Sequence, residues 1–321
     1  MSKSAATTLT AKKGRNDLWK QTCRRWQLYL FLIVPIAWLI IFHYVPMVGV
    51  QIAFRDFMPR KGIWGSNWVG MKHLITFFKS FYCARTITNT VVISLYSLCC
   101  SFPLAIIFAL MMNIIVNPKF KKAVQTITYM PHFISTVVLV GMLSQVFNPV
   151  TGLYGNIFRL FAPGEYPPDI LAKPDTFRHM YVWSGIWQNL GWNTIIYMAA
   201  LSGVDPELHE AAQIDGATRL KRVWYIDLPV LLPTASILLI MNAGSIMSVG
   251  FEKVYLMQNS LNLVQSEVIS TYVYKVGLGG TTNQLSFSAA IGLFNNVING
   301  LLLVTVNFLS KKLSDGNNSL F

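Results

Sequence analysis

The sequence predicts an all-α integral membrane protein that crosses the bilayer six times and keeps both termini in the cytoplasm. Three observations lead to this fold class. Only 12% of the 321 residues are charged and 53% are hydrophobic, whereas a soluble domain carries about 25% charged residues. Six stretches without Asp, Glu, Lys or Arg are long enough to cross a bilayer, which takes about 20 residues. Basic residues are concentrated directly before the first of these stretches.

The six apolar stretches define the expected transmembrane helices. Each is longer than an ordinary buried helix, so a very apolar soluble core is the less favoured alternative. Pro35, Pro46, Pro103 and Pro131 predict kinks or helix ends within them. The expected spans are Leu28–Val50, Thr86–Ile115, Val124–Phe147, Tyr181–Gly203, Leu228–Gly250 and Ser286–Phe308.

The charge distribution predicts the orientation in the membrane. The net charge of +13 does not indicate nucleic-acid binding, because the basic residues lie in the connections between spans. Cytoplasmic loops carry an excess of Lys and Arg, and residues 1–27 alone hold seven of them. We therefore expect a cytoplasmic N-terminal segment (1–27), a six-span domain (28–310) and a cytoplasmic tail (311–321). No signal peptide is expected, and the four cysteines are expected to be free thiols.

Three connections are expected on the outer side: Gln51–Arg85, Asn148–Met180 and Phe251–Leu285. In Gln51–Arg85, aromatic residues are mixed with Lys and Arg, and the second half is expected to be an amphipathic helix whose aromatic side chains anchor it at the membrane surface. Substrate contact is the alternative for this segment. Asn148–Met180 is rich in Pro and Gly and predicts an irregular connection.

Polar residues are concentrated in the last three expected spans. Polar groups within a bilayer need partners or line water, so these residues either join helices by hydrogen bonds or form a substrate pathway. No Asp or Glu lies deep in a span, which argues against a proton or sodium site. Aromatic rings and amides together suit sugars. The candidate pathway residues are Trp187, Gln188, Asn193, Asn242, Ser245 and Asn295.

A polar connection at 205–228 separates the fourth and fifth spans. Asp205 is a good N-cap, Pro206 suits the first helical position, and Gly216 can end the helix with a left-handed turn. Thr218 can cap a second short helix that ends at Ile226. The residues alone fit two hypotheses equally well, a docking element for a partner and a plain hairpin between two spans.

The same connection resembles the EAA loop of ATP-binding-cassette (ABC) importer permeases, with Glu210-Ala211-Ala212, Gly216, Ile226 and Leu228-Pro229 at the fixed positions. Along nearly its full length the chain resembles type I carbohydrate permeases with the MetI-like fold, which include LplB-, YteP- and MalF-like subunits. The further stretches that carry this resemblance are 42–47, 50–54, 62–66, 129–135, 205–208 and 271–274.

The resemblance implies both a function and a set of partners. The chain would be a permease subunit, not an enzyme, in the bacterial cell membrane, importing oligosaccharides released from polysaccharides. Its partners would be a second permease, usually in a heterodimer, two ATP-binding subunits that hold ATP and Mg, and an extracytoplasmic solute-binding protein. The residues expected to couple to the ATPase are Glu210, Ala211, Ala212, Asp215, Gly216, Arg219, Leu228 and Pro229.

No cofactor, metal or catalytic site is expected in the chain itself. The sequence contains no G-x-x-x-x-G-K-[ST] phosphate-binding loop, so the energy for transport would come from another polypeptide. The five histidines are scattered and are expected to be structural. Two alternatives are an importer permease for a non-sugar solute such as a peptide, and a channel or carrier that needs no ATPase.

Overall fold

The computed structural model describes residues 26–279 and 284–313. The predictions made for residues 1–25, including Cys23, and for 314–321 lie outside the described residues. The chain divides into two compact units, Met1–Gln51 and Ile52–Phe321.

The first unit is a succession of helical turns. Its elements are α2 (Trp26–Leu39), the π-helical turn η1 (Ile40–Tyr44), α3 (Val45–Met47) and the start of the 3₁₀ helix η2 (Val48–Phe54). Pro35 lies inside α2 without ending it, whereas the π-helical turn directly precedes the turn that contains Pro46. Residues Tyr29–Phe54 together are long and apolar enough to cross a membrane.

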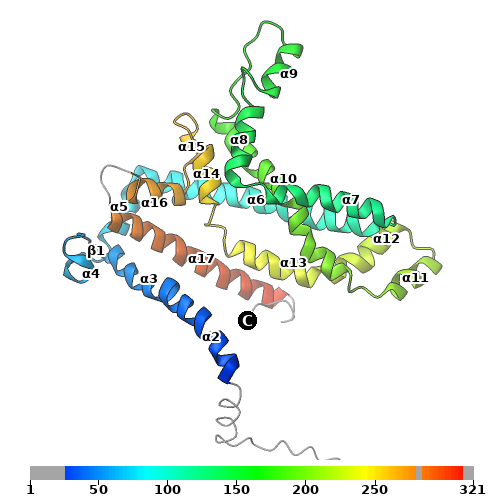
Figure 1. Cartoon of the computed structure of the whole chain (residues 1–321), viewed down its shortest axis with the longest axis horizontal. Helices are drawn as coiled ribbons and strands as arrows, with labels where there is room; N and C mark the ends of the chain where they lie inside the picture. Colours follow the sequence, from blue (N-terminus) through cyan, green and yellow to red (C-terminus); the bar gives the residue numbers. More distant parts are fainter. Residues whose placement is uncertain (1–25, 280–283, 314–321) are drawn as a thin grey trace, which may run out of the picture. The chain divides into compact units, whose positions relative to one another are not determined.

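Four long helices form the body of the second unit: α6 (Phe81–Ile114), α10 (Pro174–Leu201), α13 (Leu228–Ala243) and α17 (Leu285–Leu313). α10 packs along α6, and α13 packs against α10 and α17 (Figure 1). Ala105 and Ala109 of α6 share a buried cluster with Tyr197 of α10 and Leu231 of α13. Small residues of this kind let helices approach closely in a membrane. α6 continues through Pro103, so the predicted kink does not end this helix.

The segment before α6 contains a short hairpin and a helix. Strand β1 (Arg55–Asp56) pairs antiparallel with β2 (Asn67–Trp68), and α4 (Gly62–Gly65) lies between them. Helix α5 (Lys72–Lys79) follows, so the amphipathic helix predicted in this connection is confirmed.

The expected surface position of the aromatic residues in this segment is wrong for Phe77. This side chain is fully buried, and its ring lies 6.4 Å from that of Tyr272 in α16 (Ile269–Gly277) and 6.1 Å from that of Phe294 in α17. The packing of α5 onto α17 covers this face of the helix. Phe78 and Phe81 remain exposed.

The third expected span, Val124–Phe147, is not one straight helix. It consists of α7 (Pro118–Tyr129), the 3₁₀ turn η3 (Met130–Phe133) and α8 (Thr136–Val146), with a bend of 98° between the two arms. Pro131 lies in the turn, as predicted, and the Ser135 side chain accepts a hydrogen bond from Val138 N and starts α8. The break therefore follows from a proline and a new N-cap four residues later.

Five shorter helices complete the described part of the second unit. α9 (Leu153–Phe161) lies in the Pro- and Gly-rich connection that was expected to be irregular. Between α13 and α17, α14 (Phe251–Met257) and α15 (Leu263–Ser266) precede α16. α11 (Pro206–Ile214) and α12 (Arg219–Arg222) lie at the opposite end of the helix body from α5 and α16 (Figure 1).

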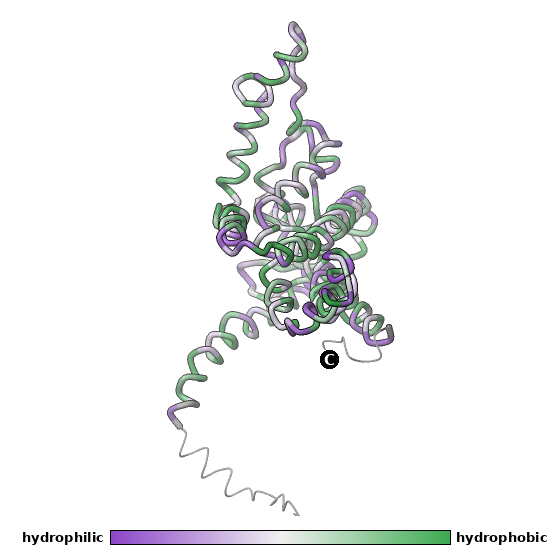
Figure 2. The backbone as a smooth tube through the Cα atoms, turned by 90° about the vertical axis from the view of Figure 1, so that its right-hand side faces the viewer, coloured by the Kyte–Doolittle hydropathy of each residue, from purple (hydrophilic) through white to green (hydrophobic). Residues whose placement is uncertain are grey.

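Among the residues that the structure describes, four helical stretches are long and apolar enough to cross a membrane: Tyr29–Phe54, Phe81–Ile114, Arg219–Ala243 and Leu285–Lys312. The bent α7–α8 pair makes a fifth if it is one broken span. α10, which contains the fourth expected span, is not among them because Gln188, Asn189 and Asn193 lower its hydropathy. Figure 2 shows the hydrophobic residues that dominate the helices.

Candidate functional site

The connection between α10 and α13 begins with a well-capped helix. The Asp205 side chain accepts a hydrogen bond from Glu207 N at 3.0 Å, and Pro206 occupies the first helical position of α11. Both features match the prediction from the sequence. An N-cap of this kind satisfies one of the unpaired N–H groups at the helix start, so α11 has a defined beginning without contacts from elsewhere.

Gly216 ends α11 in the left-handed turn that the sequence predicts. Its φ angle is +75°, Gly216 N donates to Gln213 O at 3.1 Å, and Ala217 N donates to Ala212 O at 2.9 Å. These two bonds form a Schellman motif, which glycine favours. The Thr218 side chain then accepts from Lys221 N at 3.4 Å and starts α12. The two helices are therefore joined by a turn with fixed geometry.

The predicted separate helix over 219–226 is only partly correct. α12 ends at Arg222 and passes into a π-helical turn, η4 (Val223–Asp227), which continues directly into α13. The whole stretch Arg219–Ala243 is one helix. A π turn is wider than an α turn and often marks a functional position. Movement of α12 would thus pass into α13 without an intervening loop.

The residues expected to couple to an ATPase lie together on this connection and are mostly exposed. Glu210, Ala211, Asp215, Gly216 and Arg219 are exposed. Ala212 and Leu228 are half-buried, and Pro229 lies exposed in the first turn of α13. Two large apolar side chains, Ile214 (87% exposed) and Leu220 (75%), also face outward. Small, charged and large apolar residues are thus all exposed on this connection.

Beneath α11 the structure has a cavity of about 600 Å³, lined by residues of α6, α11, α12 and η4. A buried carboxylate, that of Asp227, lies at its wall and is 2% exposed. Asn113 Nδ2, at the end of α6, donates to Asp227 Oδ1 at 3.2 Å. His209 Nε2, from α11, lies 3.2 Å from the same oxygen. Sequence reasoning missed this contact, although the charge of Asp227 beside the apolar start of a span was a usable signal.

The fifth expected span, Leu228–Gly250, loses its helical form after Ala243, and residues 244–250 lead irregularly to α14. Asn299 of α17 stabilises this segment: its Oδ1 accepts from Met247 N at 2.9 Å, and its Nδ2 donates to Ser248 Oγ at 2.8 Å. Irregular backbone at membrane depth is tolerated where it is buried or lines a cavity. Here it lines a cavity of about 160 Å³ together with Ser94, Ser97 and Tyr181.

The predicted pathway residues are distributed over three cavities. Asn242 lines the cavity at 244–250 and a second of about 440 Å³ between α6, α10 and α13. Ser245 lines the first and Asn193 the second. Trp187 lines a separate apolar cavity of about 370 Å³ beside α8. Asn295 lines none of these three, and its buried Oδ1 has no hydrogen-bond partner within residues 26–279 and 284–313.

Gln188 supports the break in the third span. It is buried, and its Nε2 donates to Ile134 O at 2.8 Å, directly after η3. His132 lies 2.9 Å from Asn189 Oδ1 and stacks on Trp192 with a centroid distance of 4.2 Å. The polar residues of α10 therefore include partners for the interrupted helix as well as cavity residues.

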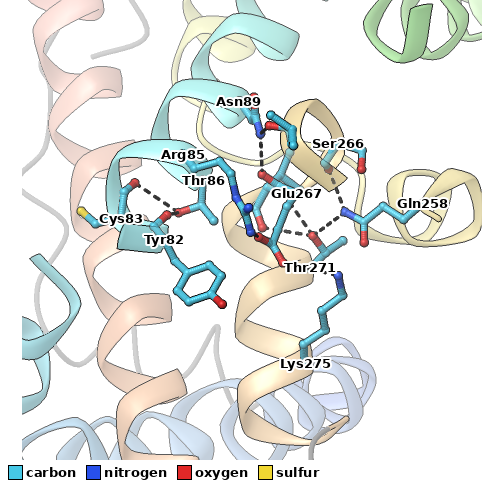
Figure 3. Close-up of polar contacts among 12 residues, drawn as sticks. Tyr82, Cys83, Arg85, Thr86, Asn89, Gln258, Ser266, Glu267, Thr271 and Lys275 are labelled. Carbon is cyan, nitrogen blue, oxygen red and sulfur yellow. Dashed lines mark hydrogen bonds and ion pairs between the residues drawn. The ribbon is translucent and has the colours of Figure 1, made fainter. Parts of the chain in front are cut away.

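At the other end of the helix body, a second buried carboxylate holds three helices together (Figure 3). Glu267 is 4% exposed, forms an ion pair with Arg85 Nη2, and lies 3.4 Å from Lys275 Nζ. Asn89 Nδ2 donates to the main-chain oxygens of Glu267 and Val264 at 3.0 and 2.9 Å. The connection that contains α15 is thus fixed to the start of α6 through both side chain and backbone.

Lys253 of α14 is buried without an acidic partner among the described residues. Its Nζ donates to Tyr181 O at 2.8 Å and lies 4.8 Å from the centre of the Tyr181 ring. Because burial disfavours the charged form, the pKa of Lys253 falls to about 8.

Comparison with known proteins places this architecture in a family. Residues 101–315 match the model for the binding-protein-dependent transport system inner membrane component. The chain is 39% identical to Protein LplB of Bacillus subtilis (strain 168) over 312 residues, which are 97% of this chain and 96% of that protein. It is 40% identical to the polygalacturonan/rhamnogalacturonan transport system permease protein YteP of the same organism, over 95% of this chain and 94% of that protein.

A solved structure shares the fold as well. A chain of a bacterial ABC transporter involved in the import of the acidic polysaccharide alginate superposes with a TM-score of 0.84 and 38% identity. The match covers 92% of this chain and 99% of that one. A related crystal structure contains that transporter in complex with an alginate pentasaccharide-bound periplasmic protein. The chain described here therefore belongs to the binding-protein-dependent transport system inner membrane components and has the fold of a type I ABC importer permease.

Proposed function

We propose that the chain is the permease subunit of an ABC importer for oligosaccharides released from polysaccharides. The observation that carries the proposal is the exposed α11–α12 element, which is closed by a rigid Schellman turn and runs directly into α13. The sequence has no phosphate-binding loop, so a separate subunit must hydrolyse the ATP. In this proposal α11 docks on that subunit through Glu210, the Ala211–Ala212 pair and the turn at Gly216.

The proposal includes a complete topology. The six crossings are Tyr29–Phe54, α6, the bent α7–α8 pair, α10, α13 and α17, with both termini and α11 in the cytoplasm. α10 is long enough for a span at 28 residues, since a span takes about 20. Its amides have partners or line cavities, which makes them tolerable at this depth.

The substrate class is supported by the cavities around residues 242–250. Their walls carry the neutral polar groups Ser94, Ser97, Asn242 and Ser245, together with the rings of Tyr181 and Trp192. Hydroxyls and amides can hydrogen-bond sugar hydroxyls, and aromatic rings can stack on sugar faces. The names of the relatives, which mention polygalacturonan, rhamnogalacturonan and alginate, support saccharides over peptides or other solutes.

The assembly in this proposal has a second permease, two ATP-binding subunits and an extracytoplasmic binding protein. The test is ATP hydrolysis by the co-purified complex in nanodiscs, with oligosaccharides presented on the cognate binding protein. Stimulation by one class of oligosaccharide is the expected result and identifies the substrate. If the ATPase subunit associates but no sugar stimulates it and a peptide does, the substrate class is wrong. Uptake that needs no ATPase subunit would indicate a channel or carrier.

A charge reversal tests the docking surface directly. Glu210 is exposed, so Glu210→Lys should leave insertion and folding unchanged. It should reduce co-purification of the ATPase subunit, because the exposed carboxylate is replaced by a cation. Glu165→Lys, at an exposed position in the distant connection after α9, is the matched control. Equal ATPase recovery from both variants would contradict a docking role for Glu210.

A further inference from the structure

α11 has few attachments to the rest of the molecule. Within the part of the chain that the structure describes, no helix packs extensively against it, and eight of its nine residues are exposed or line the cavity beneath it. The two chain ends of α11 are the turns at Asp205 and Gly216. If α11 were attached only at its ends, displacement of the helix by a partner would partly tilt it over the cavity and would move the membrane helices less.

Two side-chain contacts join α11 to the helix Arg219–Ala243 across this cavity: Arg222 Nη1 donates to Gln213 Oε1 at 3.4 Å, and His209 contacts Asp227, the only one of the two that also involves α6 among the described residues. His209 Nε2 lies 3.2 Å from Asp227 Oδ1, a distance at which a protonated imidazole and a carboxylate form an ion pair. Asn113 Nδ2 donates to the same oxygen at 3.2 Å. One carboxylate oxygen therefore joins α11, the cytoplasmic end of α6, and η4.

The position of Asp227 suits the transmission of movement. It is the last residue of the π-helical turn, and Leu228 begins α13 without a break. Its side chain is 3% exposed and that of His209 is 27% exposed, so the contact is shielded from most of the solvent. Ion pairs that are partly removed from water are screened less than surface pairs. A buried carboxylate also needs its partners, so Asp227 holds both of them in place.

We propose that Asp227 is the positioning residue that transmits movement of α11 to α6 and α13, acting through His209 and Asn113. This inference rests on the proposed docking of an ATPase on α11. In this proposal the partner contacts the exposed residues of α11 and displaces this helix. Asp227 then couples the displacement to both α6 and α13. Both spans line the cavities at Asn242. The contact therefore connects the proposed docking helix to the cavities proposed to bind substrate.

The test compares docking with coupling in the intact transporter. The complex of both permeases, ATPase and binding protein is reconstituted in proteoliposomes, and sugar uptake per ATP hydrolysed is measured. His209→Ala should keep normal ATPase recovery but lower uptake per ATP at least about fivefold, the lower end of ordinary coupling strengths. Asp227→Ala should do the same, and the double variant should lose no more than either single variant, because the two residues share one contact.

Two further variants separate a specific contact from a structural role. His209→Lys places at this position an ammonium group that can reach Asp227, and it should restore most of the uptake per ATP. Glu207→Gln removes an exposed carboxylate from the same helix without touching Asp227, and should behave like the wild type. His209 is partly exposed, so His209→Ala is informative even if Asp227→Ala accumulates poorly.

Each outcome decides a different question. Normal uptake per ATP in His209→Ala overturns the proposed role of Asp227. So does loss of ATPase recovery in His209→Ala, because His209 would then serve docking and not transmission. Failure of the wild-type complex to recruit any ATPase subunit would instead refute the proposed function on which this inference depends.

Discussion

Two connections at opposite ends of the helix body each contain one buried carboxylate, and they use it differently. In the connection from α14 to α16, Glu267 has two cationic partners, and its backbone is bonded to Asn89. In the connection from α10 to α13, Asp227 has one histidine and one amide, and it lies at the wall of a cavity. The carboxylate of the first region is paired with two cations, whereas that of the second borders a cavity.

The difference indicates which end of the molecule can move. Residues 266–269 and 271–272 are all buried, and the ring of Phe77 packs on Tyr272. Regions with dense burial and many internal bonds open only at high free energy. α11 is exposed and lies over empty space, so it belongs to the low-stability part of the structure. We therefore expect the α11 connection to move when a partner docks, while the connection around Glu267 keeps its structure.

The substitution with the largest expected effect is Glu267→Ala, which tests whether the connection around Glu267 is rigid. Removing one partner of a buried ion pair leaves Arg85 uncompensated and should lower the free energy of unfolding by about 3–5 kcal/mol. The variant should show a large drop in apparent melting temperature in detergent or fail to accumulate. Glu252→Ala, which removes an exposed carboxylate from the neighbouring α14, is the control and should be near neutral. A near-neutral effect of Glu267→Ala would show that this end is not rigid.

Lys253 provides a test by pH at the same end. Its pKa falls from 10.5 to about 8 on burial, so the protonated side chain destabilises the native state by about 3 kcal/mol below pH 8. Between pH 8 and 10.5 the unfolded chain binds more protons than the native protein, so stability rises with pH in this window. The destabilisation is fully present at pH 7 and disappears above the unfolded pKa.

Lys253→Met should therefore melt at a higher temperature than the wild type at pH 7. The gain in the free energy of unfolding should be smaller than the destabilisation caused by the protonated lysine, because the variant loses the hydrogen bond to Tyr181 O. The difference should shrink as the pH is raised from 7 to 10. Melting curves of both proteins at four pH values measure it. A difference that does not depend on pH would contradict the lowered pKa of Lys253.

At the open end, Gly216→Ala should have a smaller and local effect. A Cβ at this position has free space around it, but φ is +75°, and this conformation costs an L-residue about 1–2 kcal/mol. Hydrogen exchange of the α11 amides should accelerate, whereas melting of the whole protein should barely change. Gly203→Ala in the same connection, where φ is not left-handed, is the control. Equal exchange in both variants would contradict the assigned turn.

Local features of the open end could be predicted because they depend on neighbours in the sequence. The cap at Asp205, the turn at Gly216 and the break at Pro131 all follow from the preferences of individual residues. The contact between Asn113 and Asp227 joins residues 114 positions apart: the charge of Asp227 beside a span indicated that it needs a partner, but no local pattern identifies Asn113 as that partner. Phe77 was misplaced for the same reason, since only the packing of α5 on α16 and α17 buries it.

The pathway residues show the same limit within the membrane. An amide in a span can bind substrate or join helices, and the sequence does not distinguish the two. Gln188 donates to Ile134 O at a helix break, whereas Asn193 lines a cavity. Both lie on α10 and are five residues apart. Their different surroundings come from α7 and α8 on one side and from α6 and α13 on the other.

Asn193→Leu should have the smallest effect on stability, because the side chain is exposed at the cavity wall and such substitutions usually change stability by less than about 0.5 kcal/mol. Uptake should nevertheless fall several-fold with normal ATPase recovery, since an amide that can bind sugar hydroxyls is lost. Asn296→Leu, an exposed amide on α17 outside the three cavities, is the matched control. If both variants transport equally well, Asn193 is not a substrate contact, and the route must be sought at Asn242 and Ser245. If only Asn193→Leu is impaired, the cavity between α6, α10 and α13 lies on the route, between the rigid end and the movable end.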